Sequence, residues 1–315
     1  MGITEKAIFE QFALWEAAPH GPQARPSVDY VVVGCGSSYN LAMSVAASLN
    51  EKGFGAIAVP GNEWARRPGS YKADPRSCEV IAISRSGESS ELVQAARKSR
   101  SYGLSVIAIT CDDRSSLVVN ADRVLSAKTH AEEGIVMTAS ASLMLLLGLR
   151  FAGIDTEGSA AVAEALLRDL ERHGDSFLVE RTHFVYLGGG ALYGVAAEGA
   201  LKLQEMSCTV TQTYHPLEYR HGPISVIDDR SIIVMLYHPD TREEEERLAK
   251  ELSAKGAFVL GFGGAGDLSF SIDGPAGLRG LVCLPALQFL GAQLAHLRDL
   301  DTTAPRHLTK VVKIG

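Results

Sequence analysis

Short apolar runs alternate with helix-like segments along most of the chain. Each run is continuous in its apolar residues, and a glycine, serine or polar turn follows it. Strands of this kind are buried on both faces, which is typical of a parallel sheet covered by helices. The runs in the first half lie at residues 30–33, 80–83 and 105–110. The pattern predicts an α/β fold built on a doubly wound parallel sheet.

The same succession of runs returns in the second half of the chain. Its glycine turn at 188–190 repeats the turn at 34–36, and the offset between the two halves is consistent. An internal duplication of this kind predicts two tandem three-layer domains, each with one parallel sheet between helices. The matching runs lie at residues 183–187, 231–236 and 257–260.

These patterns divide the chain into three parts. An amphipathic helix is predicted at residues 8–18, and a connector rich in proline and glycine follows it. The boundary between the two repeats falls near residues 154–159. The predicted parts are an N-terminal helix and connector (1–26), a first domain (27–155) and a second domain (156–315).

A serine-rich loop stands where the second apolar run ends and a helix begins. Unpaired helix N–H groups and the positive end of the helix dipole meet at such a place, which suits a phosphate. The alternative is that these serines only cap the helix and shape a turn. The loop contains the hydroxyls of Ser84, Ser86, Ser89 and Ser90 together with Arg85 and Gly87.

A second pair of hydroxyls, Ser37 and Ser38, follows the first glycine turn. Carboxyl ends of parallel strands meet at a switch point of the sheet, so both sets of serines can converge there. The chain has no P-loop motif, and Tyr39 occupies the third glycine position of a dinucleotide motif. We therefore expect no nicotinamide or other cofactor. Residues 237–240 replace the serine loop in the second half, which predicts one phosphate site per chain.

Three charged residues share one edge of the apolar stripe of a helix predicted at 191–207. Glu198, Lys202 and Glu205 lie at positions i, i+4 and i+7. The simpler interpretation, which the pattern alone favours, is a solvated Glu–Lys pair that adds little stability. The alternative is a carboxylate beside an apolar surface, with its pKa raised into the range useful for proton transfer.

Two further segments carry candidate groups for chemistry. The predicted loop at residues 213–223 contains several ionisable side chains, including His221. The simpler interpretation of His221 is that it stabilises a turn before Gly222. The C-terminal stretch 303–310 follows a helix and is typical of a frayed end. Composition alone makes Lys310 a surface lysine.

Charge and cysteine content narrow the class of protein. The 315 residues carry a formal net charge of -7, which disfavours a nucleic-acid partner. Five scattered cysteines without a Cys-x-x-Cys pair indicate free thiols in the cytoplasm and no metal site. The N-terminal residues do not resemble a secretory signal. Two uncharged runs, 134–149 and 280–297, contain too many polar residues for a membrane span and predict buried core segments.

Five segments, taken together, resemble the sugar isomerase (SIS) family. The similarity is to the isomerase half of glucosamine-6-phosphate synthase and to stand-alone members that resemble glucosamine-6-phosphate deaminase. It implies two tandem SIS domains of the flavodoxin-like or Rossmann-like type. The segments follow family order across nearly the whole chain, at residues 34–39, 84–89, 198–205, 218–223 and 305–310.

The resemblance implies a catalytic set of four residues. Glu205 matches the acid/base that moves a proton between sugar C1 and C2, and Lys202 matches a lysine that supports it. His221 matches the ring-opening histidine, which reaches the site from the other subunit of a homodimer. Lys310 matches the lysine that forms a Schiff base with the ketose carbonyl, for which it must be neutral.

The resemblance also implies a set of substrate-binding positions. Arg85 stands where the synthase has glutamine, and Met137 replaces a synthase serine in the segment 132–138. Ala139 likewise replaces a lysine of the synthase. The implied positions are Ser37, Ser38, Ser84, Arg85, Ser86, Ser89, Ile135, Thr138, Glu198 and Thr309.

These residues favour a metal-free enzyme that interconverts a hexosamine 6-phosphate and a ketose 6-phosphate. No glutaminase segment is present in the sequence, so we expect the chain not to draw ammonia from glutamine by itself. Three alternatives stay open: a deglycase of fructosamine 6-phosphates, a phosphosugar sensor without turnover, and an ammonia-using subunit paired with a separate glutaminase. The presence of Glu205, His221 and Lys310 together favours catalysis over sensing.

Overall fold

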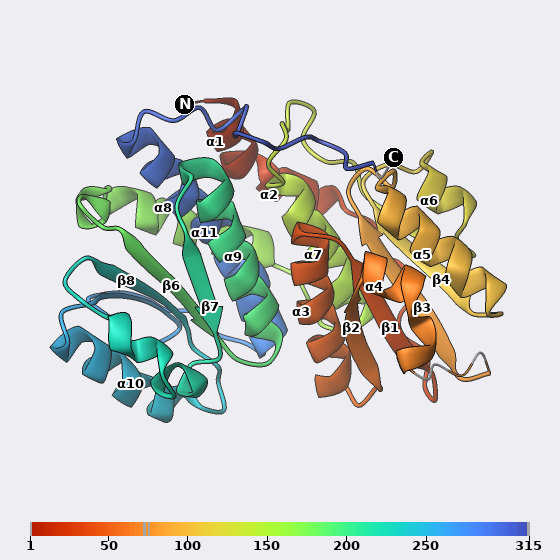
Figure 1. Cartoon of the computed structure of the whole chain (residues 1–315), viewed down its shortest axis with the longest axis horizontal. Helices are drawn as coiled ribbons and strands as arrows, with labels where there is room; N and C mark the ends of the chain where they lie inside the picture. The colour runs from red at the N-terminus through yellow and green to blue at the C-terminus, as the bar shows by residue number, and fades with distance from the viewer. Residues whose placement is uncertain (1, 72–73, 75, 314–315) are drawn as a thin grey trace.

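Two five-stranded sheets, side by side, form the frame of the molecule (Figure 1). The computed structural model describes residues 2–71, 74 and 76–313. In this part of the chain every strand pairing is parallel, which confirms the predicted α/β class. The first sheet has the order β2-β1-β3-β4-β5. Its strands are β1 (Asp29–Gly34), β2 (Ala56–Pro60), β3 (Cys78–Ser84), β4 (Ser105–Thr110) and β5 (Arg123–Ser126).

The second sheet repeats the first one strand for strand. Its order is β10-β9-β8-β6-β7, so β6 occupies the place of β1, and β7 the place of β2. All six strands expected from the apolar runs are found, and the four others are the two edge strands of each sheet. The strands are β6 (His183–Gly188), β7 (Thr211–Tyr214), β8 (Ser231–Leu236), β9 (Phe258–Phe262) and β10 (Leu268–Phe270).

Helices cover both faces of each sheet and fill the space between the two sheets (Figure 1). Alternate residues of β1 illustrate this: Val31 and Val33 pack in a core shared with α4 and α5, whereas Val32 packs in a core that spans both halves. The helices of the first half are α3 (Ser37–Glu51), α4 (Gly61–Arg66), α5 (Ser90–Ser101), α6 (Ser116–Val119) and α7 (Ala139–Phe151). Those of the second half are α8 (Ser159–Arg172), α9 (Ala191–Ser207), α10 (Arg242–Ala254) and α11 (Ala276–Leu297).

Both long apolar runs are helices buried inside the molecule. One is α7, and the other is α11, which is long and apolar enough to cross a membrane by length and composition. Most of α11 is instead covered by protein, and it packs against α8, α9 and α7. The prediction that both runs belong to the protein core is confirmed.

The predicted N-terminal helix over residues 8–18 is wrong in its bounds. The structure has two short helices, α1 (Ile3–Phe9) and α2 (Gln11–Ala17), which meet at Glu10. Glu10 leaves the helical conformation, and its carboxylate contacts His130 at 2.9 Å. The next residue, Gln11, is buried and donates to the Ile8 carbonyl and to Gln288. These two polar side chains fix the turn between the helices, which an apolar period alone does not reveal.

Close helix contacts hold α9 at the centre of the molecule. A Cβ atom at Gly194 would lie 2.3 Å from the Asn40 carbonyl oxygen of α3. A Cβ atom at Gly291 of α11 would lie 3.1 Å from the backbone of Leu203. Because glycine stands at both contacts, the helix backbones approach closely and shut water out from both sides of α9.

Candidate active site

The serine loop folds between β3 and α5 through its own side chains. The Ser84 hydroxyl accepts a hydrogen bond from the Gly87 N–H (3.1 Å), and the Ser86 hydroxyl accepts one from Glu88 (3.2 Å). Ser89 stands at the N-cap position of α5. Turn-shaping serines were the simpler alternative, and the structure shows that role. It leaves the hydroxyl protons of Ser84 and Ser86 available as donors, because both oxygens act here as acceptors.

Gly87 is required where the loop turns. Its φ of +61° lies in the left-handed region, and a Cβ atom there would lie 2.0 Å from the Ser115 hydroxyl oxygen. Any other residue would push the loop away from Ser115 and from Leu117, whose N–H donates to the Gly87 carbonyl (3.0 Å). The loop conformation therefore depends on this glycine.

Both sets of serines line one cavity of about 320 Å³. Ser37 and Ser38 begin α3 directly after Gly36, and Ser89 precedes α5, so the N-terminal ends of two helices meet here. The cavity lies at the carboxyl ends of β1 and β3, the switch point of the first sheet. Eleven of the predicted site residues line it: Ser37, Ser38, Ser84, Arg85, Ser86, Ser89, Ile135, Lys202, Glu205, Thr309 and Lys310.

The charged residues of α9 form a buried cluster, so the interpretation as a solvated pair is wrong. Lys202 and Glu198 are fully buried, and the Glu205 side chain keeps 18% of its exposure. The Lys202 Nζ lies 2.5 Å from Glu205 Oε2 and 3.4 Å from Glu198 Oε1. Packing of α3 and α11 against α9 is the cause of this burial.

Burial shifts the pKa values of two residues in this cluster, Glu198 and Lys202. Burial raises the pKa of Glu198, and the Lys202 ammonium group offsets this only in part. Burial also acts to lower the pKa of Lys202, but the carboxylates of Glu198 and Glu205 outweigh it and hold that pKa above its usual value. Lys202 is therefore a fixed cation, and Glu205 is the carboxylate of the cluster that faces the cavity.

Replacing Lys202 by methionine should cost about 3–5 kcal/mol of unfolding free energy, because it leaves buried carboxylates without their cation. Urea denaturation measures this. As a control, Lys250→Met on the exposed face of α10 should change stability by less than about 0.5 kcal/mol. Adding Glu198→Gln to Lys202→Met should recover part of the loss. A Lys202→Met chain as stable as the Lys250→Met chain would contradict a buried charge cluster.

The C-terminal tail is attached to the body, contrary to a frayed end. It crosses from α11 past α1 towards α5 (Figure 1), and Thr302 donates to the Thr4 hydroxyl at 2.9 Å. The Lys310 Nζ donates to the Glu133 carbonyl at 3.0 Å and borders the cavity. Lys310 is exposed as a residue, but its Nζ is held by the Glu133 carbonyl at the edge of the cavity.

Three predicted residues lie outside the cavity lining. Thr138 is buried at the N-cap of α7, where its N–H and hydroxyl donate to the Glu133 carboxylate. Glu198 lies behind Lys202 and receives a hydrogen bond from the Asn40 amide at 3.1 Å. His221 is exposed on the surface, directly after a 3-10 turn at Leu217–Arg220.

Six lining residues were not among the predicted catalytic or substrate-binding residues. Cys35, Gly36 and Leu308 lie in the segments that resemble the family, and Met137 stands where the synthase has serine, but none of the six was assigned a role. Burial raises the pKa of the Cys35 thiol to about 11, which keeps it protonated at neutral pH. The six are Cys35, Gly36, Glu91, Met137, Leu308 and Val312.

At the corresponding place in the second sheet, a carboxylate side chain hydrogen-bonds to the loop before α10. Glu245, in the first turn of α10, accepts the His238 N–H at 2.8 Å and the Thr241 hydroxyl at 2.8 Å. A carboxylate therefore occupies the position where α5 offers N–H groups and serines. This is in keeping with a single serine loop per chain.

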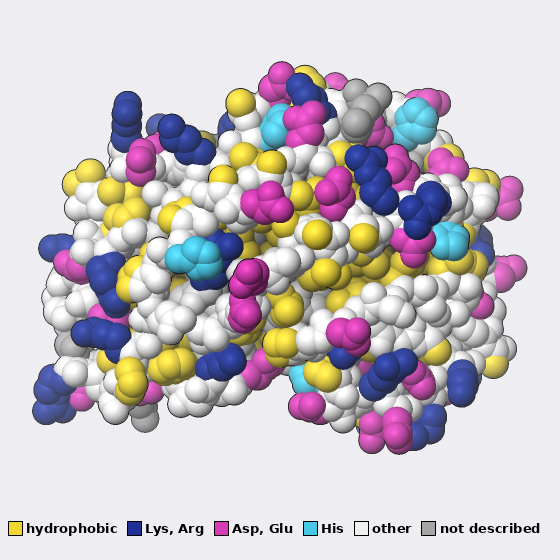
Figure 2. All heavy atoms as spheres, turned by 180° about the vertical axis from the view of Figure 1, so that it is seen from behind, with side chains coloured by type: hydrophobic (Ala, Val, Ile, Leu, Met, Phe, Trp, Pro, Cys, Tyr) yellow, Lys and Arg dark blue, Asp and Glu magenta, His cyan; other side chains and the backbone are white. Residues whose placement is uncertain are grey.

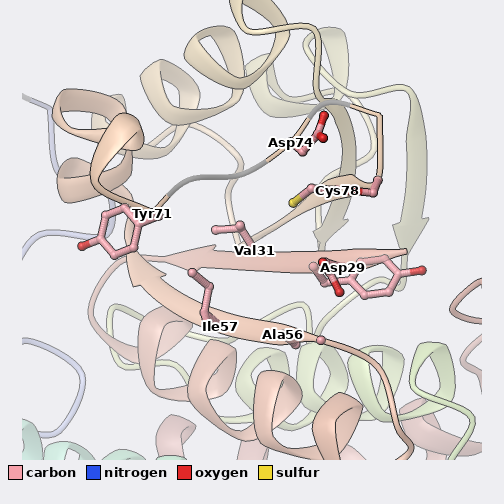
Figure 3. Close-up of a pocket in the computed structure, with 10 residues that line it drawn as sticks. Asp29, Val31, Ala56, Ile57, Tyr71, Asp74 and Cys78 are labelled. Atoms are coloured by element: carbon pink, nitrogen blue, oxygen red, sulfur yellow. The ribbon is translucent and has the colours of Figure 1, made fainter. Parts of the chain in front are cut away.

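Another cavity, of about 290 Å³, lies at the opposite end of the first sheet (Figure 3). Asp29, Ala56 and Cys78, at the amino ends of β1, β2 and β3, line it. Ligands of open parallel sheets bind at carboxyl ends, and the charged cluster of α9 is absent from this lining. The serine-lined cavity is the better candidate for chemistry.

Known proteins share both this fold and this sequence pattern. The model of the family described as "SIS domain" matches residues 27–151 and 177–267. Glucosamine-6-phosphate deaminase from Thermotoga maritima is 30% identical, with a TM-score of 0.83 over 99% of this chain and 100% of that one. Tagatose-6-phosphate ketose/aldose isomerase from Escherichia coli has a TM-score of 0.81 over 96% and 95%, and at 22% identity it supports the fold alone.

Curated relatives add a third comparison. Glutamine–fructose-6-phosphate aminotransferase (isomerizing) from Pseudomonas aeruginosa is 30% identical over 93% of this chain and 54% of its own. The chain thus spans about half the length of the curated relatives it matches. The family match covers well over half of the chain, so this protein belongs to the SIS-domain family, alongside relatives named as phosphosugar isomerases, deaminases and aminotransferases.

Proposed function

We propose that the chain interconverts a hexosamine 6-phosphate and a ketose 6-phosphate, as a phosphosugar isomerase/deaminase. The observation that carries the proposal is that Glu205 and Lys310 border the same cavity as the serine loop. One ligand can therefore contact an anion site, a proton carrier and an amine at once. The similarity to the Thermotoga maritima deaminase supports the same reaction class.

The phosphate would bind between the amino ends of α3 and α5. Ser38, Ser84 and Ser86 supply hydroxyl donors, and the two helix dipoles favour a negative group there. Ser37, Ser89 and Thr309 lie around the same cavity and complete the polar lining. No cofactor is required for this binding or for the steps that follow.

Glu205 would carry the proton. In the open-chain hexosamine phosphate, its carboxylate takes the proton from C2 to give an enolamine and returns it to C1, which leaves an imine at C2. The Lys202 Nζ lies 2.5 Å from this carboxylate and would hold it in place with a charged hydrogen bond during both transfers. The C2 proton ends on C1 and one N–H proton ends on O1, so the step is an isomerisation that needs no oxidant or reductant.

Lys310 would complete deamination. Its neutral amine attacks C2, the substrate nitrogen leaves as ammonia, and the new imine joins Lys310 to the ketose. Water then hydrolyses this imine, releasing ketose 6-phosphate and the free lysine. The sum is hexosamine 6-phosphate plus water giving ketose 6-phosphate plus ammonia, and the reverse sequence gives synthesis.

A substrate panel tests the proposal. Purified protein is incubated with glucosamine, galactosamine and mannosamine 6-phosphates and with fructosamine 6-phosphates, and released amine and ketose phosphate are both quantified. We expect equal amounts of ammonia and ketose 6-phosphate from at least one hexosamine phosphate. Amine release from fructosamine phosphates alone would identify a deglycase. Tight binding of phosphosugars without any turnover would overturn the proposal in favour of a sensor.

We also propose a homodimer in which His221 acts in the partner subunit's site. His221 is exposed and lies outside the cavity of its own chain, so a role in ring opening requires a second copy. Mixing inactive His221→Ala chains with inactive Glu205→Gln chains should restore up to about a quarter of the activity under random exchange, since one site per mixed dimer is intact. Kinetic assay after subunit exchange measures this. If no mixture recovers activity, the shared site is contradicted.

The remaining expectations are consistent with this function. All five cysteines are free, in keeping with the cytoplasm that we propose as the compartment. On the face shown in Figure 2, Lys and Arg side chains are interspersed with Asp and Glu. We propose that the two sheets represent tandem SIS domains, at residues 27–155 and 156–315. The repeated strand order and the two separate family matches support this division.

A further inference from the structure

Arg85 lies in the serine loop and borders the cavity, but its guanidinium group hydrogen-bonds to protein carbonyl groups. Its Nη1 donates to the carbonyls of Gly134 (3.0 Å) and Ile135 (3.2 Å), and its Nη2 donates to the Lys310 carbonyl (3.1 Å). The side chain is only 8% exposed, and Nη1 lies 3.8 Å from the Glu133 carboxylate. Both terminal nitrogens are therefore committed to protein acceptors.

These acceptors belong to the two segments that position the Lys310 amine. Gly134 and Ile135 follow Glu133, whose carbonyl accepts the Lys310 Nζ, while the third bond of Arg85 holds the Lys310 backbone itself. A single planar guanidinium group thus fixes both the main chain of Lys310 and the segment that receives its side chain. Lysine could not replace it, because one ammonium group cannot reach acceptors in this forked arrangement.

The other end of the serine loop holds the same tail. The Ser90 N–H donates to the Val312 carbonyl at 3.4 Å. Residues 85 and 90 of the serine loop therefore hydrogen-bond to the tail on both sides of Val311. Residues 298–313 of the tail, as far as the structure describes it, contain no helix or strand, so without these bonds they would sample many conformations.

We propose that Arg85 is a positioning residue that holds Lys310 at the phosphosugar site and links the serine loop to the C-terminal tail. The inference rests on the function proposed above, because it assigns Arg85 to the seating of the imine-forming lysine. Any shift of the serine loop on phosphate binding is transmitted through the guanidinium group to the Lys310 backbone. Arg85 acts on the reaction only through Lys310.

Two measurements on the full-length protein test this, using Arg85→Met and a control. Methionine keeps most of the side-chain stem but removes every donor. The control is Arg97→Met, which removes an exposed arginine of α5. The first measurement is the rate of trypsin cleavage after Lys310, followed by mass spectrometry. The second is borohydride trapping of fructose 6-phosphate at Lys310, with ligand affinity taken from the thermal shift.

We expect cleavage after Lys310 to be at least about tenfold faster in Arg85→Met, since three hydrogen bonds to a charged donor are lost. Trapping should fall at least about tenfold while affinity for fructose 6-phosphate stays within about threefold. Arg97→Met should match the unmodified protein in both measurements. If Arg85→Met does not fold, Arg85→Lys is measured in its place. We expect a smaller increase in the cleavage rate, and again a loss of trapping without a matching loss of affinity for fructose 6-phosphate.

Two results would overturn the inference: unchanged cleavage in Arg85→Met, or affinity that falls as steeply as trapping, which would make Arg85 an anion ligand. Failure of the proposed function has a different signature. In that case the unmodified protein binds fructose 6-phosphate but shows no trapping, while the cleavage rates still decide whether Arg85 holds the tail.

Discussion

Replacing Glu205 by glutamine should lower kcat by about 10³-fold while leaving phosphosugar affinity nearly unchanged. Glutamine has the same size and can still accept a hydrogen bond from Lys202, which lies 2.5 Å from the carboxylate. Glutamine cannot take up the C2 proton, however. The other carboxylate of the buried cluster, Glu198, cannot replace Glu205, because it does not border the cavity. Steady-state kinetics on the hexosamine phosphate found by the substrate panel measure the loss.

The matched control is Glu164→Gln, on the exposed face of α8, which should retain full activity. Thermal unfolding with and without substrate shows whether the Glu205→Gln site still binds. A kcat reduced less than tenfold, with binding intact, would mean that another group moves the proton. A loss of binding that accounts for the whole effect would assign Glu205 to substrate binding only.

The strands that could be predicted from the sequence are those in the middle of the sheets. β1, β3 and β4 are buried on both faces, so their sequences are continuous apolar runs. The four strands that were not predicted, β2, β5, β7 and β10, are all edge strands, and only β2 among them has a continuous apolar run. An edge strand has a neighbour on one side only and is partly exposed, as all four residues of β7 are. Its conformation comes from pairing with the adjacent strand, which local sequence does not encode.

The candidate site could also be predicted only in part from the sequence. The serine loop could be predicted because its chemistry is local: a strand end, a glycine and a helix start follow one another. Burial of Glu198 and Lys202 could not, since it depends on α3 and α11, about 150 residues before and 90 residues after them, packing against α9 at glycines. The placement of Lys310 rested on family resemblance alone, because the bonds that hold it come from Arg85 and Glu133 in the other half of the chain.

The two halves supply different parts of the site. The first sheet contributes the serines at the ends of β1 and β3, for which we propose anion binding, whereas α9 and the tail of the second half contribute Glu205 and Lys310. Neither half alone contains both sets of residues. In the second sheet the Glu245 carboxylate accepts the His238 N–H, so the repeat does not extend to the serine loop, and the proposed chemistry would depend on how α9 packs on α3. Substitutions at Gly194, where that contact is closest, should affect catalysis and stability together.

Replacing Lys310 by alanine should abolish borohydride trapping of ketose 6-phosphates and lower the rate of amine release by at least about 10³-fold. In the structure this amine borders the cavity and is held by the Glu133 carbonyl at 3.0 Å. Lys202, the other lysine of the site, is buried between two carboxylates that keep it protonated, so it cannot form an imine in its place.

Trapping is measured as the mass gained by the peptide that contains residue 310 after reduction. Lys310→Arg tests the charge, since it keeps a cation in the cavity but cannot form a reducible imine, and it should fail as completely as Lys310→Ala. Lys313→Ala, three residues further along the exposed tail, should trap normally. Full trapping in Lys310→Ala, with the added mass on another lysine, would transfer the role to that residue. Proton transfer without trapping in any chain would leave an isomerase that works through Glu205 alone.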